Sequence, residues 1–189
     1  MKIRILILSV FCIVLSHSTY AQNKKDMKKN HVKSVREVET SIKDGKAVTI
    51  DNSFQRFDSD ANVIESINYN DEGKIKLHQT TVYNKNGDKT EEVIFNPDGK
   101  IKKKKIYKYN STNDKIEEAQ FDPSGVLTEK TSTAYNANGE KITEVVVDGK
   151  GNVTEKSVII YDKKGMKIER KTVDGHGNLV SDKKYIYEY

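Results

Sequence analysis

The chain has little of what usually identifies an enzyme or a membrane protein. Its single cysteine, Cys12, lies in an N-terminal apolar run, so the rest of the chain offers neither a disulfide nor thiol chemistry. His31, His78 and His176 are scattered between a lysine-rich segment, a predicted strand and a predicted turn, a spacing that indicates neither a catalytic triad nor a metal cluster. Beyond the N-terminal run no segment is apolar enough to cross a bilayer. We therefore expect no enzymatic activity, no cofactor, no metal and no transmembrane segment.

The N-terminal run has the organisation of a secretory signal peptide over residues 1–21. Lys2 and Arg4 precede an apolar stretch from Ile5 to Leu15, and small residues occupy the positions that a signal peptidase reads before a cut after Ala21. The apolar stretch is too short to span a bilayer as a helix. We expect an exported protein, either periplasmic or secreted to the cell surface.

The charge of the chain is abundant and mixed in sign. Removal of Lys2 and Arg4 with the signal peptide lowers the formal net charge from +5 to +3. Such a balance predicts a well-solvated surface and argues against nucleic acid as a partner. Residues 22–34 contain five lysines and few apolar groups, which predicts a flexible arm before a repeat domain over residues 35–189.

A period of 26 residues runs through that domain. Five tyrosines follow this period without exception: Tyr83, Tyr109, Tyr135, Tyr161 and Tyr187. Phe57 extends the series towards the N-terminus, and a second series of glycines interleaves with it at alternating intervals of 14 and 12 residues. Self-similarity of this length is typical of repeat folds whose units stack on their neighbours.

Each glycine of the second series closes a predicted turn. The turns follow a pattern of aromatic residue, Asn or Asp, two further residues and Gly, as in Tyr83 to Gly87, and both prolines of the chain occupy the second turn position. These preferences belong to a type I turn in a hairpin. The segments between turns are alternately long and short, which predicts an all-β fold: an antiparallel up-and-down meander of about twelve strands.

The apolar residues lie near the strand ends. In the strand middles, the residues that point to either face are polar, as in Lys103 to Lys105. We expect one sheet margin to gather the tyrosines beside Ile116, Ile142 and Ile168, and the other to gather Phe and Val beside Ile and Leu. A sandwich or filled barrel needs an apolar face along most of each strand. The pattern therefore predicts a largely single-layer twisted sheet.

The turns and the repeat resemble the YD or RHS repeats of bacterial secreted and surface proteins. The residues that carry this resemblance are Phe121 to Leu127, Tyr161 to Gly165 and the two Asp-Gly-x-Gly-Asn segments at 148–152 and 174–178. The resemblance implies a β-hairpin array at the cell envelope, of a kind sometimes proposed to bind carbohydrate. It brings no catalytic residues. Several turns have Tyr-Asn in place of Tyr-Asp, and so few repeats cannot form the closed shell that long RHS arrays make around a toxin.

Three further patterns have a structural and a functional interpretation. The segments 58–62 and 84–88 alternate oxygen ligands like a calcium loop but lack its closing glutamate, and the same residues suit hairpin turns. The basic stretch from Lys100 to Lys108 could bind an acidic polymer, yet the hairpins bring Glu91, Glu92, Glu117 and Glu118 beside it. Adjacent acids such as Glu91 and Glu92 point to opposite faces of a strand, which excludes a glycosidase pair.

The five tyrosines are the remaining candidate site. On every second strand, their rings would recur about every 9.6 Å along one margin, where they could stack on sugar rings or receive a partner protein. They could equally serve as packing.

We expect a non-enzymatic scaffold that binds a polysaccharide or an envelope protein. One alternative is a self-assembling protein that pairs through exposed sheet edges; another is a small RHS-like component of a toxin or surface system.

Overall fold

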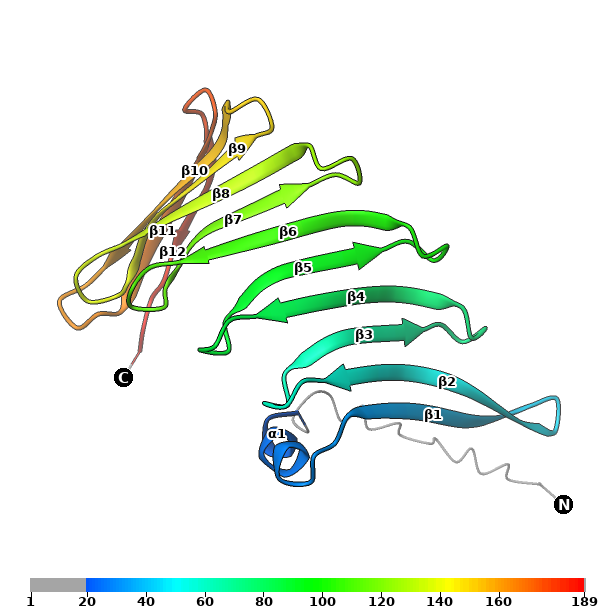
Figure 1. The fold of residues 1–189 in the computed structure, drawn as a ribbon. Coiled ribbons are helices and arrows are strands. Elements are labelled where there is room, and N and C mark those ends of the chain that lie inside the picture. Colours follow the sequence, from blue (N-terminus) through cyan, green and yellow to red (C-terminus); the bar gives the residue numbers. More distant parts are fainter. Residues whose placement is uncertain (1–19, 189) are drawn as a thin grey trace, which may run out of the picture.

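The computed structural model describes residues 20–188, so the predicted signal peptide lies almost wholly outside the described residues. One helix precedes twelve strands, which form a single sheet in sequential order (Figure 1). The elements are α1 (Tyr20–Lys29), β1 (Ser34–Lys43), β2 (Lys46–Phe57), β3 (Val63–Tyr69), β4 (Ile75–Tyr83), β5 (Lys89–Phe95), β6 (Ile101–Tyr109), β7 (Lys115–Phe121), β8 (Leu127–Tyr135), β9 (Lys141–Asp148), β10 (Val153–Tyr161), β11 (Lys167–Asp174) and β12 (Leu179–Lys184). The predicted all-β meander is confirmed.

The predicted turns are present, with the expected hydrogen bonds and with a left-handed residue at the glycine position. In the β4–β5 turn, Gly87 N donates to Asn84 O and Asn84 N to Asp88 O, and Gly87 has a φ of 84°. The side-chain oxygen of Asn84 also accepts the N–H groups of Asn86 and Asp88, each at 2.9 Å. This is a type I turn closed by a residue in the left-handed region. Asn113 takes the glycine position in the β6–β7 turn with a φ of 65°.

Each hairpin from β2 onward also contains a β-bulge just after its turn. Between β6 and β7, Tyr109 lies opposite Lys115 and Lys108 opposite Glu117, so Ile116 is an extra residue with no partner of its own. Ile142 and Ile168 occupy the same position in later hairpins. The residue directly opposite each of Tyr83, Tyr109, Tyr135 and Tyr161 is therefore a lysine. The isoleucines stay at the same margin, where Ile116 and Tyr135 line one hollow. Bulges increase the local twist, and the strand direction rotates steadily from β1 to β12 (Figure 1).

The register separates two rows of side chains. Residues directly opposite each other in an antiparallel ladder point to the same face, and successive residues point to opposite faces. Tyr107 and Tyr109 consequently share a face with Glu118, which we call the tyrosine face. Phe121 and its partner Leu127 lie on the other, the aliphatic face, at the opposite margin. The two predicted margins exist, and the register places them on opposite faces of the sheet.

The sheet forms a single layer, as predicted, and buries few side chains. The buried apolar residues are Phe57, Ala61, Ala119 and Ile159. Several other buried side chains are polar: Ser157 is 1% exposed, and its hydroxyl lies 2.8 Å from that of Thr172. Cross-strand pairs of this kind, together with the ladder hydrogen bonds, replace a conventional core.

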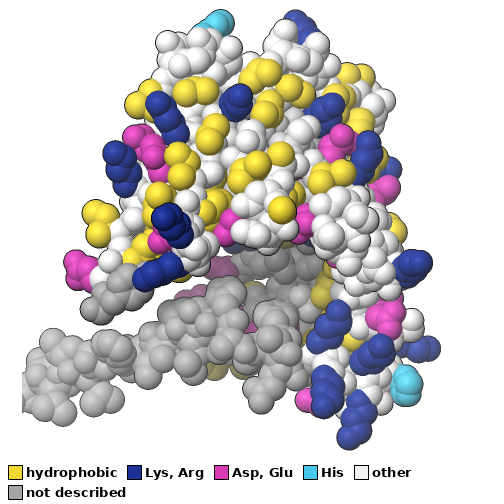
Figure 2. All heavy atoms as spheres, turned by 90° about the vertical axis from the view of Figure 1, so that its left-hand side faces the viewer, with side chains coloured by type: hydrophobic (Ala, Val, Ile, Leu, Met, Phe, Trp, Pro, Cys, Tyr) yellow, Lys and Arg dark blue, Asp and Glu magenta, His cyan; other side chains and the backbone are white. Residues whose placement is uncertain are grey.

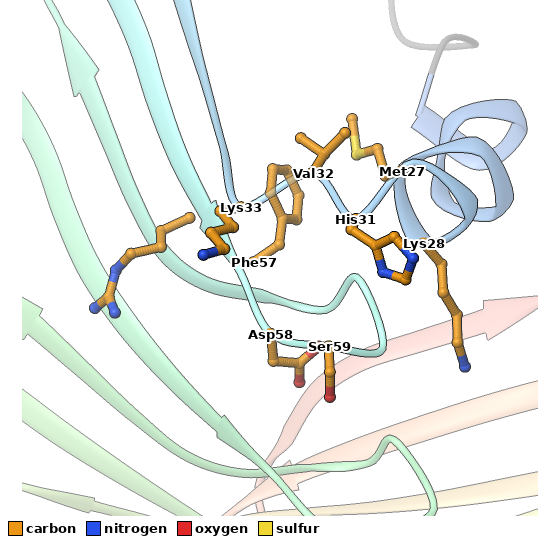
Figure 3. A pocket seen from close by; sticks show the side chains of 9 residues that line it. Met27, Lys28, His31, Val32, Lys33, Phe57, Asp58 and Ser59 are labelled. Atoms are coloured by element: carbon orange, nitrogen blue, oxygen red, sulfur yellow. The ribbon is translucent and has the colours of Figure 1, made fainter.

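The segment predicted to be a flexible arm contains helix α1. Lys24 donates to Asn62 Oδ1 at 2.6 Å and Lys28 to Asp60 Oδ1 at 2.8 Å, so the helix lies against the β2–β3 turn. The Phe57 side chain points towards Met27 and Val32, beside a cavity of about 430 Å³ (Figure 3). These contacts offset the conformational entropy that would otherwise keep the segment flexible.

Candidate functional site

The five candidate tyrosines lie at equivalent positions along one margin of the sheet. Four of them end β4, β6, β8 and β10, and Tyr187 closely follows β12. Each hydroxyl donates a hydrogen bond to the main-chain carbonyl at the start of the preceding short strand: Tyr83 to Val63 at 3.2 Å, Tyr109 to Lys89 at 2.8 Å, Tyr135 to Lys115 at 2.9 Å, Tyr161 to Lys141 at 2.9 Å and Tyr187 to Lys167 at 2.8 Å. The row therefore fastens each long strand to its predecessor, which supports the packing interpretation.

The rings are partly buried by these contacts. Tyr83, Tyr109, Tyr135 and Tyr161 are of intermediate exposure, and Tyr187 is 40% exposed. Burial raises the pKa of the Tyr83 and Tyr109 hydroxyls above the ordinary value, with a further contribution from nearby carboxylates. The raised pKa favours the protonated form of these two phenols, in which each donates its hydrogen bond to the main-chain carbonyl.

A lysine and a glutamate accompany the tyrosines on the same face. Lys115 lies opposite Tyr109 and binds Glu118 at 2.7 Å, and Glu118 also binds Lys105 at 2.7 Å. Burial opposes ionisation of Glu118, but the hydrogen bonds and charges of the two lysines outweigh it and lower its pKa. Lys89 with Glu92 and Lys141 with Glu144 repeat the pair at 2.6 and 2.9 Å.

Sequence reasoning missed these pairs, although the 26-residue period contains them. Lys89, Lys115, Lys141 and Lys167 recur with that period, as do Glu92, Glu118 and Glu144. The fourth position of the glutamate series is Arg170, so the charge pattern changes at the C-terminal end of the sheet.

A shallow hollow lies at the tyrosine margin between two successive turns. Its volume is about 580 Å³, and its lining includes Thr112, Asp114, Ile116, Tyr135 and Asn138. It combines aromatic and aliphatic carbon with amide, hydroxyl and carboxylate groups, as sites for polar small molecules do.

The aliphatic row is the other exposed feature. Cross-strand pairs form it: Phe95 with Ile101, Phe121 with Leu127, Val147 with Val153 and Val173 with Leu179. Val153 is 45% exposed and Leu179 59%. Figure 2, viewed from the side of the C-terminal strands, shows hydrophobic side chains exposed between charged ones.

The other candidates have structural roles. Asp58 Oδ1 accepts the N–H groups of Asp60 and Asn62, at 2.9 and 2.8 Å, as the turn interpretation predicts for the calcium-like segment. In the basic stretch, Lys104 binds Glu91 and Lys108 binds Glu117, at 2.8 and 2.7 Å, so the prediction of a charge-paired strand is confirmed.

The histidines are not brought together. His78 stacks on Phe95 with ring centroids 4.6 Å apart and contacts Glu65 at 2.9 Å, whereas His176 lies in the β11–β12 turn. Within residues 20–188, no group of three His, Cys, Asp or Glu side chains could hold a metal ion. The same range contains no helix with the length and apolar character needed to cross a bilayer.

No family model matches the chain, and no curated protein does. Among solved structures, it is similar to a chain in the crystal structure of TcdB2-TccC3-Cdc42, at a TM-score of 0.42 and 9% identity over 82% of this chain and 10% of that one. A chain in the crystal structure of the GtfA/B complex bound to UDP and GlcNAc matches at a TM-score of 0.24 and 9% identity, over 79% of this chain and 24% of that one. Both matches are short segments of much longer chains, and at these scores neither carries an argument about function.

Proposed function

We propose that the protein is an exported, non-enzymatic β-repeat scaffold that binds a carbohydrate or protein partner at the cell envelope. The observation that carries this proposal is the pair of partly exposed rows on opposite faces of one open sheet. Each row offers the same contact at every second strand, and repeated contacts suit a polymer or an extended partner because their affinities combine.

A polysaccharide is the partner that the tyrosine row favours. An aromatic ring with a polar tip suits a sugar, and the hollow beside Tyr135 supplies amide, hydroxyl and carboxylate groups. We expect polysaccharide pull-down to fail when Tyr109 and Tyr135 are both changed to Ala. Changing both to Phe keeps the rings and removes only their hydrogen bonds to Lys89 and Lys115, so this control should retain binding. Undiminished binding by the folded Ala variant would exclude the tyrosine row.

A protein partner is favoured by the aliphatic row. Exposed apolar patches on a single protein commonly mark interaction surfaces. Val158 and Ile160, on the same face as the row, are 41% and 44% exposed. Proximity labelling in the native host should recover a partner that is lost when both residues become Ser. An unchanged set of labelled proteins would contradict this form of the proposal.

The resemblance to YD or RHS repeats motivates an alternative, a small component of a toxin or surface system. A toxin or secretion gene cluster beside this gene would favour it, and a polysaccharide-uptake cluster would favour the carbohydrate form. Export itself is tested by fractionation of cells that express the full chain: a protein that remains with the cytoplasm would contradict the predicted signal peptide.

A further inference from the structure

The outer edge of β12 repeats an edge that is paired inside the sheet. β12 lies on β11 in the same register as β6 on β5: Lys105 faces Glu92 and Lys183 faces Arg170. Past the end of β12, Tyr185 N donates to Ile168 O, so the ladder continues to this residue. The hydroxyls of Tyr109 and Tyr187 both donate to a lysine carbonyl at 2.8 Å.

Inside the sheet, β7 completes the site that β6 presents. Glu118 lies opposite Tyr107, and its carboxylate binds Lys105 at 2.7 Å. Lys115, opposite Tyr109, places its Nζ 5.3 Å from the centre of the Tyr107 ring, and Lys89 approaches the same ring at 5.9 Å. The tyrosine thus lies between two cations, next to a glutamate.

At the β12 edge only half of this arrangement is present. Lys167 Nζ lies 4.4 Å from the centre of the Tyr185 ring, as Lys89 lies near Tyr107. Among the described residues no strand lies beyond β12, and no acid occupies the Glu118 position beside Lys183. Lys183 faces Arg170 instead of a glutamate. Arg170 has Glu144 as a partner at 3.7 Å, whereas Lys183 and Lys167 have no acidic partner among the described residues. The edge therefore combines open ladder groups with the positive charge of these two lysines, which suits an antiparallel strand bearing an acid opposite Tyr185.

The opposite edge of the sheet carries such an acid. β1 is the other edge strand, exposed from Ser34 to Thr40. Its Glu37 faces Ser53 of β2. Ser53 is equivalent to Lys105 of β6, two repeats later, and Lys105 faces Glu92 of β5. Glu37 therefore has the position on β1 that Glu92 has on β5. β1 also has the strand direction that a neighbour of β12 needs, because directions alternate through the sheet.

We propose that β12 of one copy pairs with β1 of a second copy, with Glu37 of the second copy taking the role of Glu118 beside Lys183 and Tyr185. The contact is head-to-tail, so it leaves both outer edges free and extends the sheet from copy to copy. This inference specifies the partner of the proposed scaffold, and to that extent it rests on the proposed function.

Charge exchange in the full-length exported protein tests the contact. By analytical ultracentrifugation, the wild type should associate as its concentration rises. Lys183→Glu and Glu37→Lys should each weaken association about tenfold or more, because each places like charges beside one another across the contact. Combining both changes in one chain, or mixing the two variants in equal amounts, should restore it. Lys102→Glu, at an exposed position of β6 in the middle of the sheet, matches the charge change away from both edges and should behave as the wild type.

Circular dichroism and thermal unfolding would establish that the variants are folded. A wild type that stays monomeric, single variants that associate normally, or a mixture that stays monomeric would each overturn the inference. Capture of polysaccharide or a protein by a strictly monomeric wild type would overturn the edge contact alone and leave the proposed function standing. Self-association through the edges without any captured partner would uphold the contact and count against the two rows as binding surfaces.

Discussion

The two ends of the sheet differ in how the last side chain of the tyrosine row is covered. At the N-terminal end, Phe57 takes the place of a tyrosine in the row, and its ring is buried beside Met27 and Val32 of the α1 region. At the C-terminal end, Tyr187 keeps its hydroxyl bond to Lys167 but remains 40% exposed. A repeat array needs its terminal units covered or satisfied. Here α1 covers part of one end, and within residues 20–188 no comparable element covers β12.

The largest effect should come from removing the buried ring at the covered end. Phe57→Ala should lower the free energy of unfolding of the N-terminal repeats by about 3 to 5 kcal/mol. Denaturant unfolding with hydrogen exchange should show β1 to β3 opening while β9 to β11 keep their protection, because coupling in a repeat array passes between neighbours. Tyr187→Ala is the matched change at the other end and should cost less. Equal losses in protection along the whole sheet would contradict this neighbour-to-neighbour behaviour.

A second test compares Glu118, which forms ion pairs with two lysines, with Arg170, which occupies the equivalent position near the C-terminal end of the sheet. Glu118→Gln should cost about 1.5 to 3 kcal/mol at neutral pH, since it weakens two charged hydrogen bonds, to Lys105 and Lys115. Because the folded pKa of Glu118 lies below its ordinary value of 4.5, its contribution is present above that value and is lost as the pH falls through the folded pKa. Urea unfolding at neutral and acid pH should show the variant and the wild type converging in acid.

The control for this test is Arg170→Gln at the equivalent position near the open end. Its longer contacts, 3.7 Å to Glu144 and 3.3 Å to Ser157, predict a smaller loss at neutral pH. A gap between Glu118→Gln and the wild type that persists unchanged in acid would show that the glutamate acts through packing rather than charge.

The sequence made the strands and turns predictable because their signals are local. An Asn or Asp followed three residues later by Gly sets each turn, and the turns set the strand lengths. The bulges were not predictable: one extra residue per hairpin leaves Ile116 without a ladder partner and decides which face each row occupies. Such a shift depends on how neighbouring strands pair rather than on any residue pattern within one of them.

Helix α1 and the tyrosine contacts had weak or absent signals. Residues 20–29 contain neither Gly nor Pro and include several good helix formers, yet a short helix is marginal alone. Its presence depends on docking against the β2–β3 turn. The tyrosine row was recognisable from its period, but that each hydroxyl binds a carbonyl of the preceding strand follows only from the three-dimensional register.

A smaller effect should separate interior and terminal tyrosines. Tyr83→Phe should cost about 0.5 to 1.5 kcal/mol, because the Val63 carbonyl loses a partly buried donor. Tyr187→Phe should cost less, since water reaches the exposed Lys167 site and replaces the hydroxyl. Thermal unfolding of the two variants measures the difference, and a larger loss at Tyr187 would mean that another strand or molecule covers the open end.

The smallest effect should come from Lys28→Ala at the covered end. The Lys28 and Asp60 side chains are 60% and 65% exposed, so solvent screens their attraction. We expect a slight increase in hydrogen exchange at the β2–β3 turn in low salt and none in high salt, where the wild-type pair is already screened. Met27→Ala provides the contrast, because loss of apolar contact beside Phe57 should not depend on salt. If Lys28→Ala released α1 as fully as Met27→Ala does, the helix would be held mainly by charge, and the covered end would depend on ionic strength where the open end does not.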